Sequence, residues 1–254
     1  MSTAQITWPV FKIKLLDRSE VAQDTMAFRF ERPAGWNFKA GQFVDITALD
    51  PPETDSEGNV RGFSVASSPY EDTLMVATRM RNTAFKRVLA ALPLQTEFKI
   101  EGPFGNLVLH NNARKPAILL AGGIGITPFR SIVRHAAHEK LPHQIYLFYS
   151  NYRPEDAPFL EELGDLEKQN LNYHFIPTMT AMERSERPWS GERGFINAQM
   201  LAKHLRVAAP SDPPVAEAIY YIAGPPGMVA ALRKMLADWG VDEDNIRTEE
   251  FAGY

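Results

Sequence analysis

The stretch Gly122-Gly123-Ile124-Gly125-Ile126-Thr127-Pro128 has residue types and spacing that suit the binding of a phosphate group. It follows the apolar run Ala117 to Ala121, so we predict a buried strand that turns into a helix at the glycines. Glycines remove Cβ atoms that would hold a ligand away from the backbone, and the amides at a helix start bind phosphate oxygens. Pro128 suits the first helical position. The spacing lacks the last glycine of the dinucleotide-binding pattern, so an ordinary strand-to-helix turn also fits.

A second candidate group is Arg61-Gly62-Phe63-Ser64, at the start of another predicted strand. An arginine, an aromatic ring and a hydroxyl can serve one ligand only if they reach the same side of the strand. Strand alternation places Arg61 and Phe63 on one face and Ser64 on the other, unless the strand twists or bulges. These residues also fit a strand with a surface arginine and a buried phenylalanine.

In the predicted elements around Arg61 to Ser64, the hydrophobic pattern repeats every two residues. From Phe11 to about His110, apolar residues alternate with polar ones, as in half-buried antiparallel strands. We predict six short strands and therefore a small closed barrel. One helix, Ala84 to Leu92, interrupts them. The predicted strands lie near residues 11–15, 26–31, 43–48, 62–66, 74–80 and 98–101.

The elements that carry the glycines have a different period, which begins after Asn111 to Pro116. Buried strands alternate with helices there, and this order predicts a parallel sheet covered on both faces. Ligands bind beyond the carboxyl ends of such strands, where the glycine turn falls. The segment Ala181 to Arg193 is predicted to be a long surface loop. The predicted strands are 117–121, 145–149, 172–176, 218–223 and 246–248, with helices from 129 and at 157–169, 196–205 and 227–239.

Length and composition limit the function further. A chain of 254 residues is expected to form two domains, and a net charge of -4 argues against a nucleic-acid partner bound by bulk charge. The absence of cysteine excludes disulfides, cysteine nucleophiles and a cysteine-ligated iron-sulfur cluster in this sequence. The six histidines show no metal-ligand spacing, so we predict no metal site. Met1 to Phe11 resembles no signal peptide and no apolar run could span a bilayer, so we expect a cytoplasmic protein without membrane insertion.

Three further stretches stand in order with the two candidate groups: Ala40-Gly41-Gln42-Phe43, Glu101-Gly102-Pro103-Phe104-Gly105 and Ala223-Gly224-Pro225-Pro226-Gly227-Met228. In this order the motifs resemble the ferredoxin:NADP reductase superfamily of flavin-dependent electron-transfer enzymes. The resemblance runs from about Phe11 to Tyr254. It implies an antiparallel β-barrel that binds FAD at residues 1–112, followed by an α/β parallel-sheet domain that binds NAD(P) at residues 113–254.

The resemblance also implies roles in the first half. In the element Arg61-Gly62-Phe63-Ser64, the arginine would neutralise the FAD pyrophosphate, the ring would stack on the isoalloxazine, and the serine hydroxyl would lie near flavin N5. The family has tyrosine at the position of Phe63. A phosphate-binding helix start would fall at Asn82, Thr83, Ala84 and Phe85, with the backbone amides as the main donors.

In the second half, the resemblance places two segments around the nicotinamide nucleotide. Gly122, Gly123, Gly125 and Thr127 would approach the pyrophosphate and nicotinamide, with Pro128 at the helix start. Gly224, Pro225 and Pro226 would form the facing wall, next to Ala223, where many relatives have cysteine. The C-terminal aromatic that covers the flavin would be Phe251 or Tyr254. The resulting catalytic candidates are Ser64, Thr127, Phe251 and Tyr254.

The choice between NADP and NAD stays open. Ser150, Arg153 and Arg184 could hold a 2′-phosphate, because no acidic residue ends the strand before them. Against this, Thr180-Ala181 stands where NADPH-specific relatives often have Ser-Arg.

The resemblance implies hydride transfer from NAD(P)H to FAD, then single-electron transfer to a small carrier protein such as ferredoxin or flavodoxin. We expect a monomer, with a basic rim for the carrier formed by Lys39, Arg79, Arg81, Lys86 and Arg87. One alternative is the reductase component of an oxygenase, or a reductase of free flavin or ferric chelates. Another is a non-catalytic flavin-binding regulatory subunit.

Overall fold

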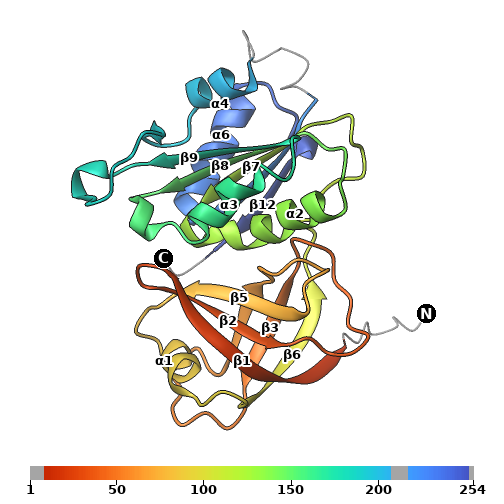
Figure 1. Cartoon of the computed structure of the whole chain (residues 1–254), viewed down its shortest axis with the longest axis vertical. Helices are drawn as coiled ribbons and strands as arrows, with labels where there is room; N and C mark the ends of the chain where they lie inside the picture. The colour runs from red at the N-terminus through yellow and green to blue at the C-terminus, as the bar shows by residue number, and fades with distance from the viewer. Residues whose placement is uncertain (1–8, 207–216, 252–254) are drawn as a thin grey trace.

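A computed structural model describes residues 9–206 and 217–251 of the chain, which form two halves, each built on a six-stranded sheet (Figure 1). The first sheet is antiparallel and the second is parallel, as the two periods of the sequence predict. Residues 105–116, where we predict the domain boundary at 112/113, belong to neither sheet. The predicted fold class is therefore confirmed.

The antiparallel sheet has the strand order β4-β3-β6-β1-β2-β5. Its alternating residues turn one face inward: Ile13 and Leu15 of β1 are at most 1% exposed, and Ile100 of β6 is fully buried. Beyond the end of β4 the chain bonds to β5, since the Ala66 amide donates to the Met75 carbonyl at 2.7 Å. The strands are β1 (Val10–Ala22), β2 (Thr25–Glu31), β3 (Phe43–Ala48), β4 (Val60–Ser64), β5 (Thr73–Arg79) and β6 (Glu97–Phe104).

Helix α1 (Ala84–Ala91) is the helix predicted inside the barrel half. Phe85, Val88 and Leu89 lie on one face and join the barrel core, because residues three and four apart share a helix face. This packing fixes the start of α1 beside β4. The Phe85 ring lies 5.9 Å from the Phe63 ring, measured between centroids.

The parallel sheet has the order β10-β9-β8-β7-β11-β12. Every residue of β7 and β11 is buried, as expected for central strands of a sheet covered on both faces. The carboxyl ends of these two strands are neighbours, since Ala121 is paired with Ala223. The strands are β7 (Ala117–Gly122), β8 (Ile145–Asn151), β9 (Tyr173–Met179), β10 (Glu192–Arg193), β11 (Ile219–Gly224) and β12 (Ile246–Glu250).

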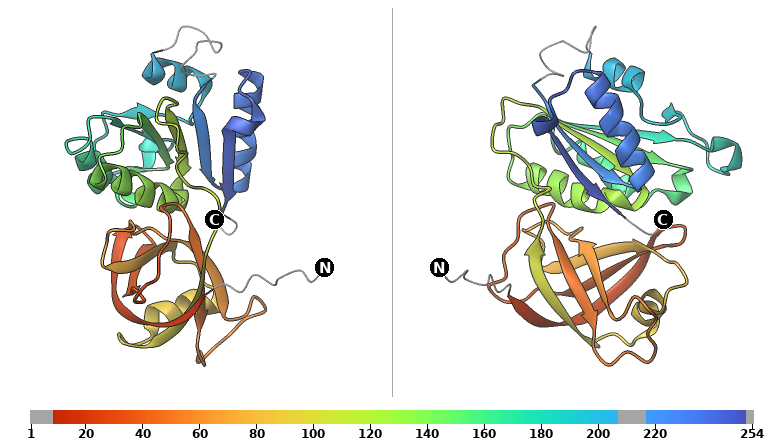
Figure 2. Two further views of the ribbon diagram at one scale, coloured as in Figure 1. Left: turned by 90° about the vertical axis from the view of Figure 1, so that its right-hand side faces the viewer. Right: turned by 180° about the vertical axis from the view of Figure 1, so that it is seen from behind.

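Four α-helices of the described chain cover this sheet, two on each face (Figure 2). Helices α2 (Ile126–His138) and α3 (Leu160–Leu166) share a core with Leu119, Leu147 and Tyr149. Helices α4 (Ala198–Leu205) and α6 (Pro226–Asp238) pack on the opposite face. Among residues 9–206 and 217–251, no helix has the length and apolar character needed to cross a bilayer.

Three elements differ clearly from the sequence-based prediction. Strand β1 continues to Ala22, well beyond the predicted end near residue 15. Helix α3 begins at Leu160 instead of residue 157, because Phe159 at its N-cap has a left-handed backbone (φ +62°). The predicted loop 181–193 contains the short 3-10 helix η3 (Met182–Arg184) and the edge strand β10, which pairs in parallel with β9. A strand of two residues is too short to show a hydrophobic period. Two further 3-10 helices are η2 (Pro154–Asp156) and η4 (Glu243–Asn245).

Candidate active site between the two halves

A cavity of about 360 Å³ lies where the two halves meet. Its walls come from β4, β5, the start of α1, the glycine turn and the residue after β12. Segments far apart in the sequence therefore converge on one space. The predicted site residues that line it are Arg61, Gly62, Phe63, Ser64, Thr83, Thr127 and Phe251.

Both Phe63 and Ser64 reach this cavity, although neighbouring strand residues ordinarily face opposite sides. They lie at the end of β4, the terminal strand of the sheet order, where the chain turns toward β5. Most of the Phe63 ring is buried in the barrel core, with 8% of the residue exposed. Only part of the Phe63 ring is therefore available for the predicted stacking on a flavin.

Ser64 is bound to the second half of the molecule through Glu249 of β12. The Ser64 hydroxyl donates to Glu249 Oε1 at 2.9 Å. Burial raises the pKa of the Glu249 carboxyl, and the hydrogen bond from Ser64 partly opposes this. No motif in the sequence predicted a role for Glu249. Its position two residues before Phe251 is the one signal that could have identified it.

Arg61 is surrounded by the acidic loop that precedes β4. Its guanidinium pairs with Glu57 Oε2 at 2.8 Å and Asp55 Oδ1 at 3.4 Å, and lies over the Phe85 ring. The other oxygen of Asp55 accepts a hydrogen bond from the Ala84 amide at 2.9 Å. This bond holds the pKa of Asp55 below its usual value. A carboxylate thus occupies the helix start where the sequence predicts a phosphate.

Donors without an acid partner line the cavity close to this loop. Thr83 Oγ1 and Arg79 Nε are buried and have no hydrogen-bond partner among the described residues. The Lys86 ammonium donates to the Arg79 carbonyl at 2.7 Å. Burial, followed by repulsion from Arg81 and Arg61, lowers the pKa of Lys86 to about 8. Unpaired donors and a destabilised cation fit an anionic group such as a diphosphate.

The glycines of the β7 turn are explained mainly by contacts inside the protein. A Cβ at Gly122 would lie 2.3 Å from Met228 Sδ, and one at Gly125 would lie 2.3 Å from the Ala223 carbonyl oxygen. Gly123 has a left-handed backbone (φ +50°), which glycine adopts without strain. These residues allow the turn to pack closely on the end of β11. Their predicted approach to a nucleotide stays a prediction.

Thr127 and Ile124 bring this turn to the cavity. Ile124 lies in the 3-10 helix η1 (Gly123–Gly125), and Thr127 is 1% exposed, with its hydroxyl bound to the Ile124 carbonyl at 3.1 Å. Pro128 is the third residue of α2 instead of the first. It still lies in the first helical turn, where an amide has no partner inside the helix.

The segment at the end of β11 supports Phe251. The Phe251 amide donates to the Gly224 carbonyl at 3.0 Å, and Pro226 is the first residue of α6, preceded by Pro225 at the N-cap. Phe251 is partly buried against Ile124 in an apolar cluster. The other terminal candidate, Tyr254, lies outside the described residues.

Other predicted binding residues have different partners. Arg153 pairs with both carboxylate oxygens of Asp156 at 2.8 Å and donates to Gln23 Oε1 at 2.8 Å. Asn82 is exposed and accepts a hydrogen bond from Arg87 at 2.6 Å. Ser150 lies in β8, beside Gly122. The roles of these side chains in cofactor binding stay predictions.

The predicted basic rim is divided among different surroundings. Arg79, Arg81 and Lys86 line the cavity, whereas Lys39 lines a separate one with His110 and Arg247. Arg87 pairs with Glu53 at 2.6 Å. These five residues therefore do not lie along one edge of the candidate site.

Comparison with known proteins is consistent with the arrangement of both halves. Residues 119–234 match the family model of the oxidoreductase NAD-binding domain. The chain is 24% identical over 222 residues to the reductase component of propane 2-monooxygenase from Rhodococcus jostii, which covers 86% of this chain and 57% of that protein. The chain thus spans less than two thirds of that relative.

Solved structures show the same two-domain fold. The cytochrome P450 reductase GcoB of Amycolatopsis superposes with a TM-score of 0.78 and 21% identity, over 97% of this chain and 72% of that one. A ferredoxin NADP+ reductase from Neisseria gonorrhoeae, with bound FAD and NADP, superposes with a TM-score of 0.75 and 24% identity, over 95% of this chain and 98% of that one.

Proposed function

We propose that the chain belongs to the ferredoxin:NADP reductase-like superfamily and is a flavin-dependent oxidoreductase that uses FAD and NAD(P)H, as its matched NAD-binding domain and two-domain fold support. The observation that carries the proposal is the convergence of β4, the start of α1, the glycine turn and Phe251 on one cavity. When bound, FAD would accept a hydride from NAD(P)H and release electrons singly. The protein contributes by holding the two reactants close together in a fixed orientation.

The described residues suggest which part of the cavity holds which part of the flavin cofactor. Thr83, Lys86 and Arg79 would bind the pyrophosphate, because they provide donors that have no acid partner. Ser64 would lie at the reacting edge of the flavin, held in place by Glu249. Phe63 and Phe251 would contact the ring system from β4 and from the C-terminal segment.

Thr127 and the backbone of the glycine turn would position the nicotinamide end of the second substrate. Thr127 lines the same cavity as Ser64, so the two hydroxyl-bearing residues approach it from opposite halves of the molecule. This arrangement supports a reaction in which nicotinamide meets flavin at the interface. Between NADH and NADPH, the pairing of Arg153 with Asp156 removes one of the predicted 2′-phosphate donors but does not decide the preference.

The proposed acceptor is a separate one-electron carrier such as ferredoxin or flavodoxin, with the chain acting as a monomer. Since residues 1–254 contain no cysteine, they hold no cysteine-ligated iron-sulfur centre themselves. Service to an oxygenase is a second candidate, favoured by the similarity to the propane 2-monooxygenase reductase component. Reduction assays with purified ferredoxin, flavodoxin and oxygenase components would separate these acceptors.

Anaerobic stopped-flow spectroscopy tests the central proposal. The protein is reconstituted with FAD and mixed with NADH or NADPH, and the loss of oxidised-flavin absorbance is followed. We expect at least one nucleotide to bleach the flavin in a single-turnover phase whose rate saturates with nucleotide concentration. If neither nucleotide bleaches a tightly bound flavin, the enzyme proposal is wrong and a non-catalytic flavin-binding subunit becomes the better description.

A further inference from the structure

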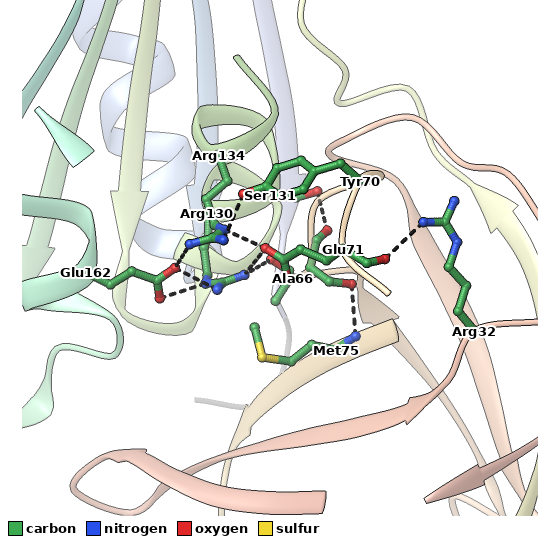
Figure 3. A network of polar contacts seen from close by, with 10 residues as sticks. Arg32, Ala66, Tyr70, Glu71, Met75, Arg130, Ser131, Arg134 and Glu162 are labelled. Atoms are coloured by element: carbon green, nitrogen blue, oxygen red, sulfur yellow. Dashed lines mark hydrogen bonds and ion pairs between the residues drawn. The ribbon is translucent and has the colours of Figure 1, made fainter. Parts of the chain in front are cut away.

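A network of polar contacts joins the two halves immediately behind the candidate site, through residues 130–134 of α2 (Figure 3). Arg130 Nη1 donates to the Ala66 carbonyl at 2.6 Å, and Ser131 Oγ donates to the Ser67 carbonyl at 2.7 Å. Ser131 is fully buried and Arg130 is 5% exposed. We call these two hydrogen bonds, from Arg130 to Ala66 and from Ser131 to Ser67, the interface contact.

The interface contact lies very close along the chain to the residues proposed to meet the two reactants. Arg130 follows Thr127 by three residues, which is about 4.5 Å along a helix axis. Ala66 follows Ser64 by two residues, at most about 7 Å of extended chain. A displacement at the interface contact is therefore transmitted almost directly to the spacing between Thr127 and Ser64.

Arg130 contacts three different segments at once, the third being residue Glu71 of the first half, whose Oε1 lies 3.6 Å from Arg130 Nη1. Besides the Ala66 carbonyl, its Nε and Nη2 donate to the Glu162 carboxylate of α3 at 3.0 and 2.6 Å, and its guanidinium lies 4.9 Å from the Phe159 ring centroid. The planar, rigid guanidinium fixes the directions of these contacts. A buried ion pair is weak evidence for stability, because desolvation offsets much of the attraction. The contacts of Arg130 are thus better explained as orienting the two halves than as adding net stability to the fold.

The segment that receives the interface contact is itself tightly bound within the barrel. The Ala66 amide donates to the Met75 carbonyl at 2.7 Å, and the Met75 amide donates to Ser67 Oγ at 2.9 Å. Further contacts join the halves beside it, since Arg134 donates to the Glu71 carboxylate and to the Tyr70 hydroxyl. The bonds of Ser64 to Glu249 and of Arg153 to Gln23 also cross between the halves. The interface contact is therefore a rigid connection from α2 through residues 66–67 to β5.

We propose that Arg130 and Ser131 are positioning residues, which set the distance and orientation between the nicotinamide side and the flavin side of the cavity. They touch neither reactant and act through the carbonyls of Ala66 and Ser67. The inference rests on the proposed function, since it assigns these residues to hydride transfer across the interface. Loss of the interface contact would slow hydride transfer without weakening nucleotide binding, because the nucleotide-binding residues of the second half remain in place.

Two variants, Ser131→Ala and Arg130→Lys, test the proposal against the control Val133→Ala. Val133 is buried in the same helix, in the apolar core. In the first measurement, amide hydrogen exchange is followed in residues 65–75 of the protein without nucleotide. Exchange at Ala66 and Met75 should accelerate in Ser131→Ala and Arg130→Lys and stay at the wild-type rate in Val133→Ala. Equal exchange in the three variants overturns the proposal.

In the second measurement, flavin reduction is followed at saturating nucleotide. For Ser131→Ala and Arg130→Lys, the rate constant should fall on the order of 10- to 100-fold while the nucleotide Kd changes less than about twofold. Val133→Ala should keep the wild-type rate. An unchanged rate, or a loss that appears only in the Kd, overturns the inference. If the flavin bound to the wild-type protein is not reduced, the proposed function itself fails. That outcome is distinct from a loss of rate that is seen only in the Ser131→Ala and Arg130→Lys variants.

Discussion

The half-buried ammonium of Lys86 gives a quantitative prediction about cofactor binding. Its pKa of about 8 means that roughly nine tenths of Lys86 is charged at pH 7 and roughly one tenth at pH 9. Lysine ordinarily has a pKa near 10.5. If the FAD pyrophosphate binds the charged form, FAD affinity falls as pH rises through about 8. The Kd should thus increase about tenfold between pH 7 and pH 9, which corresponds to about 1.4 kcal/mol.

The sign follows from the direction of the pKa shift. Burial disfavours the charged form of Lys86, so this side chain destabilises the folded protein without FAD at pH values below about 8. The destabilisation disappears as pH rises toward 10.5, the ordinary pKa of lysine. An anionic ligand reverses the effect, since it favours the ammonium.

FAD titrations of the protein freed of cofactor, followed by flavin fluorescence from pH 6 to 9.5, provide the assay. Lys86→Arg should bind FAD with an affinity independent of pH in this range, because arginine stays charged. Lys86→Met should bind about tenfold more weakly at pH 7 and also show no dependence. A wild-type Kd that is constant from pH 7 to 9 would refute the reasoning, as would an equal decline in Lys86→Arg.

Three other predictions concern the loop, the terminal strand and the glycine turn. Asp55→Asn should tighten FAD binding about fivefold in the same titration, because it removes a competing negative charge from the helix start; weaker binding would contradict this. Burial raises the pKa of Glu249, so the contribution of this carboxyl to the stability of the wild-type protein should decrease as pH rises above its ordinary pKa of 4.5. Glu249→Gln has no carboxyl to ionise, so it should melt about 2–4 °C higher than wild type at pH 8 and at the same temperature as wild type at pH 4. Gly125→Ala should lower the free energy of unfolding, measured in urea, by about 3 kcal/mol, because its Cβ would overlap the Ala223 carbonyl oxygen. Gly227→Ala should raise this free energy by up to about 1 kcal/mol, because no atom lies within 4 Å of its added Cβ. Equal effects of the two alanines would contradict the packing explanation.

The two halves show how much a hydrophobic period can predict. In β1, buried Ile13 and Leu15 follow the period of two, and in β7 the continuous apolar run is buried throughout. These patterns reflect which residues are buried on folding, so they predict whether a segment is a helix or a strand and which of its faces is buried. They failed at β10, a two-residue strand held by pairing with β9. They also placed the start of α3 too early, because nothing in the period shows the left-handed backbone of Phe159.

For the candidate site, the sequence motifs and the family resemblance pointed to Arg61 to Ser64, Thr127 and Phe251, and these residues line the cavity. Lys86 was assigned to a surface rim instead, because a lysine near a helix start is ordinarily exposed. Its burial results from the packing of α1 against the barrel, which the sequence does not express as a motif. The side chains at Asp55 and Glu249 were missed for a related reason, since lone carboxylates are usually solvated surface groups.

The sequence by itself determined the two sheets, the glycine turn at the end of β7 and the order of the segments that form the cavity. The tertiary structure decided which side chains meet: Ser64 with Glu249, 185 residues away, and Arg130 with the carbonyl of Ala66, 64 residues away. Periodicity and local motifs act over a few residues, so they specify the elements and their buried faces. Contacts between the halves depend on how two separate cores pack together, and that packing is set by the complete surfaces of both.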